Sequence, residues 1–406
     1  MIEINQYQEV VNFYDNQNNH KKEDYQYQNI LSLQEFKKAK TEIHTWSGYQ
    51  RTPLHELEEF AKQTNVSKIY YKDESHRFGL KSFKALGGAY AVANLLIEEL
   101  IKKGITATSK DLLDKTYKNI TDTITVSCAT DGNHGKSVAW AAQMFSCKCE
   151  IFIHSHVSKK REEEIAKFGA VLTRIDGNYD DSVRVADQTA QENGYFTVSD
   201  TSYEGYTKVP KDVMQGYTVM VDESVNQMKD LPSHIFLQGG VGGMAAAVVS
   251  FFNETYGEDA PKFIIVEPKN ADCLLQSAKN NEPTVVHGDL DTIMAGLSCG
   301  EVSLLAWDIL KNSVGSFLSI DDSLIGNTMK LLSQNKTPII AGESAVAGLV
   351  GFLCAQGDQG IREKLNINEE SKILFYGTEG DTDEEIYKQL VGESSEVILN
   401  KVNKEI

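Results

Sequence analysis

The sequence is poor in proline, in positive charge and in long apolar runs. Only seven prolines occur in 406 residues, and no stretch resembles a long linker rich in proline, glycine or serine, so any domains divide between packed layers. The 40 Lys and Arg residues are outnumbered by 58 Asp and Glu, which gives a formal net charge of −18. Such an acidic surface repels phosphate backbones and anionic lipid headgroups, which argues against nucleic acids and membranes as partners. No apolar run reaches the roughly 18 residues that a membrane-spanning helix needs.

Targeting signals and a disulfide scaffold are also missing. The N-terminal residues lack a basic start followed by an apolar stretch, so no signal peptide is visible and we expect a cytoplasmic protein. Six cysteines in so long a chain do not make a disulfide framework. Cys147 and Cys149 form a lone C-x-C without a second pair at zinc-ligand spacing, so we expect no metal site. For Cys273 and Cys299 we favour two free thiols over a redox-sensitive bridge.

What the sequence does contain is a regular alternation of apolar, strand-like runs and helical patterns. The strand-like runs lie at 124–128, 149–154, 171–175, 195–198, 235–237, 263–266, 317–320 and 373–376. The helical stretches lie at 137–145, 159–168, 182–192, 244–256 and 323–333. This alternation predicts an α/β fold in which helices cover parallel sheets on both faces.

The first segment with chemical character is RFGLKSFKALGG (77–88), which leads into an apolar helix. A lysine at a helix start is unusual, because the positive end of the helix dipole repels cations. The same field lowers the pKa of an amine, which suits a lysine that must be neutral to form a Schiff base. Lys81 and Lys84 both meet this description, and an ordinary surface lysine is the alternative for each.

The second segment is the turn VSCATDGNHG (126–135), which directly follows an apolar strand and precedes a helix. Small residues and glycines let backbone N–H groups approach a ligand closely at the carboxyl end of a parallel strand. Four polar residues share this turn, namely Thr130, Asp131, Asn133 and His134. The segment is therefore either a binding turn for a carboxylate or ring oxygen, or an ordinary tight connection.

The third segment is LQGGVGGM (237–244), again between a strand and a helix. Four glycines with free N–H groups at a helix N-terminus can cradle a phosphate without any basic side chain. The loop lacks the lysine of a P-loop and does not fit G-x-G-x-x-G, so it predicts a phosphate site without naming the ligand.

The fourth segment, LFYGTEGDTD (374–383), carries the last strand into polar residues. A hydroxyl or a carboxylate here could reach a ligand at the carboxyl edge of the sheet. A helix cap formed by Asp381 or Thr382 is the alternative.

Taken together and in this order, the segments resemble the tryptophan-synthase-β-like (fold type II) pyridoxal-phosphate enzymes. The resemblance extends from about residue 49 to residue 390, which is nearly the whole chain. The phrases that carry it are YQRTPL, RFGLKSFKALGGAYA, ATDGNHG, SDTSYEGYTKVPKDVMQGY, QGGVGGMAAAV, VEPKNADCL, AGLSCGE, GESAVAGLVG and GTEGDTD. The resemblance implies two parallel-sheet domains with the cofactor in the cleft between them. We expect a large cofactor-binding domain of residues 1–85 and 232–406, and a smaller substrate-side domain of residues 86–231.

The resemblance also assigns residues to the cofactor, pyridoxal 5'-phosphate. It selects Lys84 over Lys81 as the lysine that carries the cofactor, because that lysine follows Phe in the family motif. It places Asn133 near the ring hydroxyl and Thr378 beside the pyridine nitrogen. The phosphate loop maps to Gly239, Gly240, Val241, Gly242 and Gly243.

Within this family the chain is most similar to members that eliminate ammonia from 2,3-diaminopropionate, a carbon–nitrogen lyase reaction that yields pyruvate and two ammonia. Asp131 and Asp200 look like the acidic pair of those members. Carboxylates favour the protonated form of the leaving amine, whereas a dehydratase faces a hydroxyl and gains less from them. We expect Asp131 to be the base for the D-isomer and freed Lys84 the base for the L-isomer. A serine/threonine dehydratase of the same fold is the alternative.

The family pattern is not complete. After GE, the phrase at 300–310 replaces the usual Pro-Asn-Pro character, and DTDEE lacks a usual proline. Both departures lie outside the residues with chemical roles, so they bear on the substrate and not on the reaction class. The resemblance implies a small amino-acid substrate and a homodimer. A catalytically dead amino-acid sensor and a Rossmann dehydrogenase are more distant alternatives.

Overall fold

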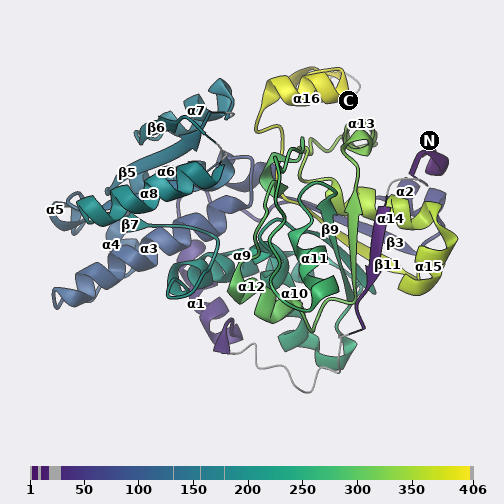
Figure 1. The fold of residues 1–406 in the computed structure, drawn as a ribbon, viewed down its shortest axis with the longest axis horizontal. Helices are drawn as coiled ribbons and strands as arrows, with labels where there is room; N and C mark the ends of the chain where they lie inside the picture. Colours follow the sequence, from purple (N-terminus) through teal and green to yellow (C-terminus); the bar gives the residue numbers. More distant parts are fainter. Residues whose placement is uncertain are drawn as a thin grey trace. The chain divides into compact units, whose positions relative to one another are not determined.

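The computed structural model describes residues 2–7, 11–17, 29–130, 132–155, 157–177 and 179–402. The chain divides into two compact units, whose elements are labelled in Figure 1. The large unit comprises Met1–Asn29, Arg51–Ser82 and Met220–Ile406, and the small unit comprises Ile30–Gln50 and Phe83–Val219. Compared with the expected domain ranges, residues 30–50 and 83–85 group with the small unit and residues 220–231 with the large unit.

A seven-stranded sheet forms the centre of the large unit, in the order β1-β10-β9-β8-β11-β3-β2. The five inner strands are parallel and the two edge strands, β1 and β2, are antiparallel. Strands covered on both faces are continuous apolar runs, and β8 and β10 are buried at every residue. The strands are β1 (Val11–Asp15), β2 (Leu54–Glu56), β3 (Lys68–Asp73), β8 (His234–Gln238), β9 (Lys262–Pro268), β10 (Ser316–Ile320) and β11 (Lys372–Gly377).

Helix α14 (Ala347–Gly357) lies directly on this sheet and is buried along most of its length. A Cβ on Gly348 would stand 2.8 Å from the carbonyl oxygen of Phe236, so only glycine permits this approach. The rings of Phe236 and Phe352 are 5.6 Å apart and hold helix and strand together. The other helices of the unit are α2 (Glu58–Thr64), α10 (Gly243–Tyr256), α11 (Cys273–Asn280), α12 (Leu304–Leu310), α13 (Ile325–Ser333), α15 (Gln359–Leu365), α16 (Glu384–Val391) and α17 (Ser395–Val402).

The small unit contains a four-stranded, fully parallel sheet in the order β6-β5-β4-β7. Its strands are β4 (Thr125–Ala129), β5 (Lys148–His154), β6 (Val171–Ile175) and β7 (Phe196–Thr197). Its helices are α1 (Leu33–Ile43), α3 (Lys84–Lys102), α4 (Ser109–Leu113), α5 (Lys118–Thr121), α6 (Asn133–Phe145), α7 (Lys159–Ala166) and α8 (Tyr179–Asn193), with the first residues of α9 (Lys208–Gln227). The predicted α/β class with parallel sheets is confirmed.

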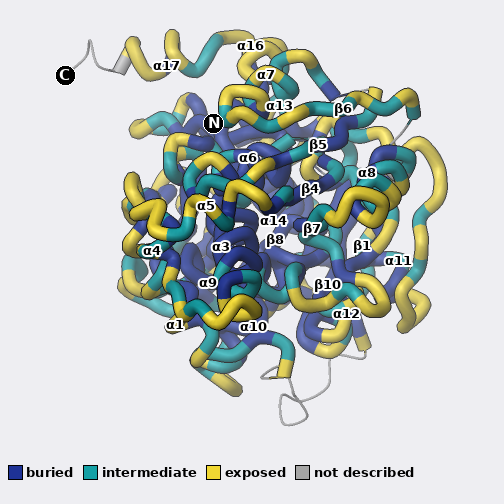
Figure 2. Tube along the Cα trace, turned by 90° about the vertical axis from the view of Figure 1, so that its left-hand side faces the viewer, coloured by how far each residue is buried: buried dark blue, intermediate teal, exposed yellow. Residues whose placement is uncertain are grey.

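Helix α3 is the buried helix of the small unit, and most of its residues are inaccessible to solvent (Figure 2). Glycines let its neighbours approach closely. A Cβ on Gly88 would overlap the hydroxyl of Ser137 on α6, and a Cβ on Gly216 of α9 would stand 2.5 Å from the carbonyl oxygen of Leu86. These contacts fix the start of α3, which is the position of Lys84. Among the described residues, no helix is long and apolar enough to cross a membrane.

Candidate active site

Lys84 is the first residue of α3, and its amine forms an ion pair with the carboxylate of Asp200. The side chain of Lys84 is 20% exposed and that of Asp200 is 15% exposed, so water reaches both. The ammonium lies 5.5 Å from the ring centre of Phe83 and 6.0 Å from that of Tyr217. These rings favour a cation at this place. Lys81, the other eligible lysine, pairs instead with Asp381 at 2.9 Å.

The Asp200 carboxylate is held in its charged form. Burial alone would raise the pKa of Asp200, but the charge of Lys84 and the neighbouring His134 outweigh it and hold this pKa well below its usual range. Asp200 lies 116 residues from Lys84 in the sequence. The structure therefore brings together two of the three residues to which we assigned catalytic roles.

The turn after β4 is organised by Thr130. Its hydroxyl oxygen accepts hydrogen bonds from the N–H groups of Gly132 and Gly135, at 3.0 and 3.1 Å. A Cβ on Gly135 would overlap the methyl group of Thr130, so this position requires glycine. Asn133 follows as the first residue of α6. Asp131 lies outside the described residues, so its predicted role stays a prediction.

His134 extends the Lys84–Asp200 pair, although the sequence marked it only as a member of the turn. Its side chain is buried, and Nε2 lies 2.7 Å from the carbonyl oxygen of Val198. Its Nδ1 lies 3.9 Å from Oδ2 of Asp200. Burial lowers the pKa of His134, so the ring is neutral near pH 7. A histidine directly after a binding turn was the signal that could have identified it.

Helix α6 also anchors the backbone of Lys84. The hydroxyl of Ser137 donates a hydrogen bond of 2.8 Å to the carbonyl oxygen of Lys84. Since Ser137 is 1% exposed, water does not compete for this bond. The two helices that begin with the candidate residues Lys84 and Asn133 are therefore joined at their first turns.

The glycine loop of the large unit connects β8 to α10. Gly240 and Gly242 have φ angles of +61° and +94°, which glycine adopts without strain. A Cβ on Gly239 would overlap the side chain of Glu267, so the loop is closed to larger residues. Within the described part of the chain, no backbone hydrogen bond has the N–H of Gly240, Val241 or Gly243 as its donor. Free N–H groups at the start of a 14-residue helix fit a phosphate group.

Two cysteines flank this loop. The thiol of Cys273 lies 3.6 Å from the carbonyl oxygen of Gly240, and Sγ of Cys299 lies 3.9 Å from the position of a Cβ on Gly240. Neither cysteine forms a disulfide; Cys273 is buried and Cys299 is partly exposed. Burial raises the pKa of Cys273 well above its usual value, so this thiol is not a reactive thiolate.

Thr378 directly follows β11 and is 5% exposed. Its neighbour Glu379 is held within the large unit, because Oε1 accepts a hydrogen bond from the N–H of Ser344 at 3.1 Å. The carbonyl oxygen of Glu379 accepts another from the N–H of Gly342 at 3.0 Å. The segment after β11 is thus fixed by the 342–344 loop. The cap of the following helix α16 is neither Asp381 nor Thr382 but Asp383, whose side chain accepts a hydrogen bond from the N–H of Ile386 at 3.2 Å.

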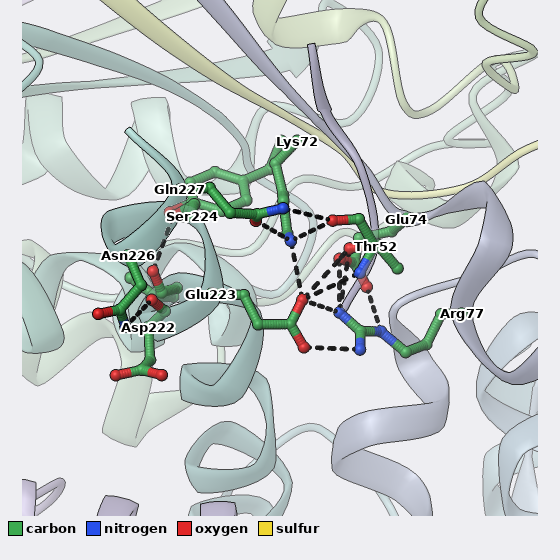
Figure 3. Close-up of polar contacts among 11 residues, drawn as sticks. Thr52, Lys72, Glu74, Arg77, Asp222, Glu223, Ser224, Asn226 and Gln227 are labelled. Carbon is green, nitrogen blue, oxygen red and sulfur yellow. Dashed lines mark hydrogen bonds and ion pairs between the residues drawn. The ribbon is translucent and has the colours of Figure 1, made fainter. Parts of the chain in front are cut away.

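A buried network of charges joins residues shortly before Lys84 to Glu223 of α9, and sequence reasoning did not identify it (Figure 3). Arg77 donates to Glu74 through Nε at 2.9 Å, and to both carboxylate oxygens of Glu223 at 2.8 Å each. Lys72 donates to Glu223 at 2.8 Å, and the hydroxyl of Thr52 donates to Glu74 at 2.6 Å. All four charged side chains are at most 1% exposed.

The network holds the large-unit part of the segment that leads to Lys84. Burial alone would lower the pKa of Arg77, but Glu74 and Glu223 outweigh it and raise this pKa. The pKa of Glu223 is lowered, because Arg77 and Lys72 more than offset its burial. The next residues, Phe78 and Lys81, have positive φ angles of 50° and 60°. A strained backbone of this kind persists only where its surroundings fix it, and Arg77 supplies such a fixed point.

The chain is similar to pyridoxal-phosphate enzymes along most of its length. A family model described as pyridoxal-phosphate dependent enzyme matches residues 45–375. The chain is 40% identical to the diaminopropionate ammonia-lyase of Escherichia coli (strain K12) over 379 residues, which cover 91% of this chain and 94% of the relative. It is 25% identical to the biosynthetic L-threonine dehydratase of Lactococcus lactis subsp. lactis (strain IL1403) over 308 residues, which cover 74% of this chain and 66% of the relative.

Among solved structures, too, the chain is more similar to diaminopropionate ammonia lyase than to threonine deaminase. The crystal structure of the Escherichia coli diaminopropionate ammonia lyase in complex with D-serine has a TM-score of 0.86 at 37% identity, and covers 96% of this chain and 99% of its own. The apo form of that enzyme has a TM-score of 0.80 at 34% identity, and covers 94% of this chain and 96% of its own. The threonine deaminase of Solanum lycopersicum shares 19% identity and supports the fold alone.

Proposed function

Because the chain belongs to the pyridoxal-phosphate-dependent enzymes of fold type II, we propose that it eliminates ammonia from 2,3-diaminopropionate. The product hydrolyses in water to pyruvate and a second ammonia. The observation that carries this proposal is the 40% identity over 91% of the chain to a relative named for that reaction. The dehydratases, our alternative from the sequence, are only 25% identical over 74% of the chain.

The cofactor is pyridoxal 5'-phosphate, which when bound supplies an electron sink for the negative charge that develops at Cα of the substrate. The described residues fit this group. Within the described part of the chain, the N–H groups of Gly240, Val241 and Gly243 donate no backbone hydrogen bond and are available to a phosphate. A Cβ on Gly239 would overlap the side chain of Glu267, so the loop keeps this shape only with glycine. We assign Lys84 to covalent attachment, Asn133 to the ring hydroxyl and Thr378 to the pyridine nitrogen.

Proton transfer falls to the chain's own side chains. Lys84 in its neutral form removes the Cα proton of the L-isomer, and Asp131 removes that of the D-isomer. Asp200, whose pKa is held low by Lys84 against the effect of its burial, keeps a negative charge in the site. Such a charge favours the ammonium form of the 3-amino group, which leaves more readily than the free amine. A hydroxyl leaving group, as in a dehydratase, has no amine to protonate and gains less from a carboxylate at this place.

The same proposal covers the biological setting. We place the enzyme in the cytoplasm, where its substrate is a small amino acid, and we expect it to act as a homodimer. The formal charge of −18 supports the exclusion of nucleic acids and anionic membranes as partners. Light scattering of the purified enzyme measures the dimer directly, and a monomer at micromolar concentration would contradict it.

The experiment is a comparison of pyruvate release from D- and L-diaminopropionate and from D- and L-serine. The wild type should act faster on diaminopropionate than on serine. Asp131→Asn should lose activity on the D-isomer far more than on the L-isomer. Asp122→Asn, which changes an exposed residue of the same unit, should keep its activity on both isomers. Faster release from serine would refute the substrate, and equal loss of both isomers would refute the assignment of Asp131 as the D-specific base.

A further inference from the structure

Lys84, Asp200 and His134 form a row of three titratable side chains within the small unit. The Lys84 amine contacts Oδ2 of Asp200, and the same oxygen lies 3.9 Å from Nδ1 of His134. His134 is 8% exposed, and its Nδ1 has no hydrogen-bond partner among the described residues. A buried polar atom without a partner is costly, so its position calls for an explanation.

The tautomer of His134 follows from its other ring nitrogen. Nε2 lies 2.7 Å from the carbonyl oxygen of Val198, and a carbonyl oxygen can only accept, so Nε2 carries the hydrogen. The carbonyl cannot turn away, because Val198 is itself fixed by a backbone hydrogen bond of 2.8 Å to Ser127. In the neutral ring, Nδ1 therefore bears a lone pair that faces the Asp200 carboxylate.

Nδ1 of His134 and the carboxylate of Asp200 are both hydrogen-bond acceptors, so one proton between them can satisfy both. A proton on Nδ1 turns the pair into an imidazolium–carboxylate ion pair and satisfies the buried nitrogen. The Lys84 amine donates a hydrogen bond to the same oxygen of Asp200, so an ammonium proton of Lys84 is in contact with the carboxylate. A small rotation of the Asp200 side chain would bring its oxygen within hydrogen-bond distance of Nδ1.

We propose that His134 accepts, through Asp200, the proton that Lys84 must lose to react. The ammonium of Lys84 gives a proton to Oδ2 of Asp200, and Asp200 gives that proton to Nδ1 of His134. Lys84 ends as a neutral amine, Asp200 again as a carboxylate and His134 as an imidazolium. The net charge of the three groups is zero before and after, so the transfer places no unpaired charge in the site. This deepens the proposed function, on which it rests, because both cofactor attachment and removal of the Cα proton need the neutral amine.

Three other titratable groups of the small unit do not compete for this proton. Burial raises the pKa values of Cys128 on β4, of Tyr206 and of Tyr217 on α9, so these groups stay protonated and neutral. Lys136, the next charged residue of α6, pairs with Glu164 of α7 at 3.4 Å.

Among the described residues, the charges that act on His134 are those of Asp200 and Lys84. After burial, which lowers the pKa of His134, Asp200 raises it and Lys84 lowers it. Loss of the proton from Lys84 therefore strengthens the affinity of His134 for a proton, and this coupling is reciprocal. His134 acts through Asp200 by positioning a proton, and not on the substrate itself.

The first test is the pH dependence of kcat for L-diaminopropionate in the holoenzyme, because kcat reports the groups of the enzyme–substrate complex, in which Lys84 is free of the cofactor. His134→Gln should move the acidic limb upward by about one pH unit, because Lys84 then loses its proton only at higher pH. The rates of variant and wild type should converge at alkaline pH. His44→Gln, which changes an exposed histidine of the same unit, should reproduce the wild-type curve. A His134→Gln curve that is lowered equally at every pH shows a purely structural role and overturns the proposal.

The second test requires no substrate. Full-length protein freed of cofactor, its fold checked by circular dichroism, is labelled with ¹⁵N-histidine and titrated by NMR. Lys84→Met should raise the pKa of His134 by about one unit or more, and Asp200→Asn should lower it. If the pKa of His134 is unchanged in Lys84→Met, the proposal is overturned. This titration alone tests the proposal if His134→Gln does not fold. An enzyme that shows this coupling but releases no pyruvate from diaminopropionate would refute the proposed substrate and not the proton transfer.

Discussion

Replacing Arg77 by methionine removes the centre of the buried charge network while it retains most of the side-chain volume. Arg77 donates hydrogen bonds to Glu74, Glu223 and Thr52. Without it, Lys72 still neutralises Glu223 at 2.8 Å, but Glu74 retains only the hydroxyl of Thr52. One carboxylate is then buried without a cation. Removal of one partner from a buried pair costs about 3–5 kcal/mol, and we expect Arg77→Met to lose a free energy of unfolding in this range.

Urea unfolding, followed by circular dichroism and tryptophan fluorescence, measures this loss. The matched control is Lys62→Met, because Lys62 and Glu59 form an ion pair with the same i,i+3 spacing on the surface. An exposed pair of this kind contributes little, so the control should unfold like the wild type. Adding Glu74→Gln to Arg77→Met should recover part of the loss, since it removes the unpaired charge. If Arg77→Met were as stable as the control, the network would not stabilise the fold and our reasoning would be wrong.

Three further predictions concern the glycine loop and two buried titratable groups. In Gly239→Ala the new Cβ overlaps the side chain of Glu267, so the N–H groups of the loop move apart. We expect at least about a tenfold loss of cofactor affinity, measured by absorbance titration. Unchanged affinity would count against the phosphate assignment. Burial lowers the pKa of His234 to about 4, so between about pH 6.5 and 4 the unfolded chain binds a proton at this histidine and the folded chain does not. The free energy of unfolding should therefore fall as the pH drops through this range. His234→Gln should make that fall smaller in urea titrations. Burial raises the pKa of Asp212 to about 6, although Asn94 donates a hydrogen bond to its carboxylate. Ionisation of Asp212 therefore destabilises the fold as the pH rises from about 4 to 6. Asp212→Asn should raise the melting temperature at pH 8 and have less effect at pH 4.

The α/β class could be predicted because the local pattern and the fold agree. Buried parallel strands are continuous apolar runs, and β8 and β10 lie at the ranges expected from their residues. The family and its cofactor were also predicted correctly, since nine phrases kept the family's order. The polar segment before residue 50 was less informative. Its helix α1 belongs to the small unit, and Trp46, which follows this helix, has its ring 6.3 Å from that of Trp140. Contacts between residues so far apart in the sequence leave no local signal.

The site was only partly visible in the sequence. The resemblance named Lys84 and Asp200, and the structure places them in contact. The resemblance assigned no role to His134, because a histidine in a turn has several ordinary uses. It assigned none to Arg77 and Glu223 either, since charged residues in a sequence normally indicate a solvated surface. Only the fold shows that these charges are buried together.

The most direct test of the account is where the cofactor is attached. The holoenzyme is reduced with borohydride, digested and mapped by mass spectrometry. We predict a single pyridoxyl modification on Lys84, at the start of α3, and an unmodified Lys81, which is occupied by its ion pair with Asp381. A modification on Lys81, or a protein that carries no modification at all, would contradict the account.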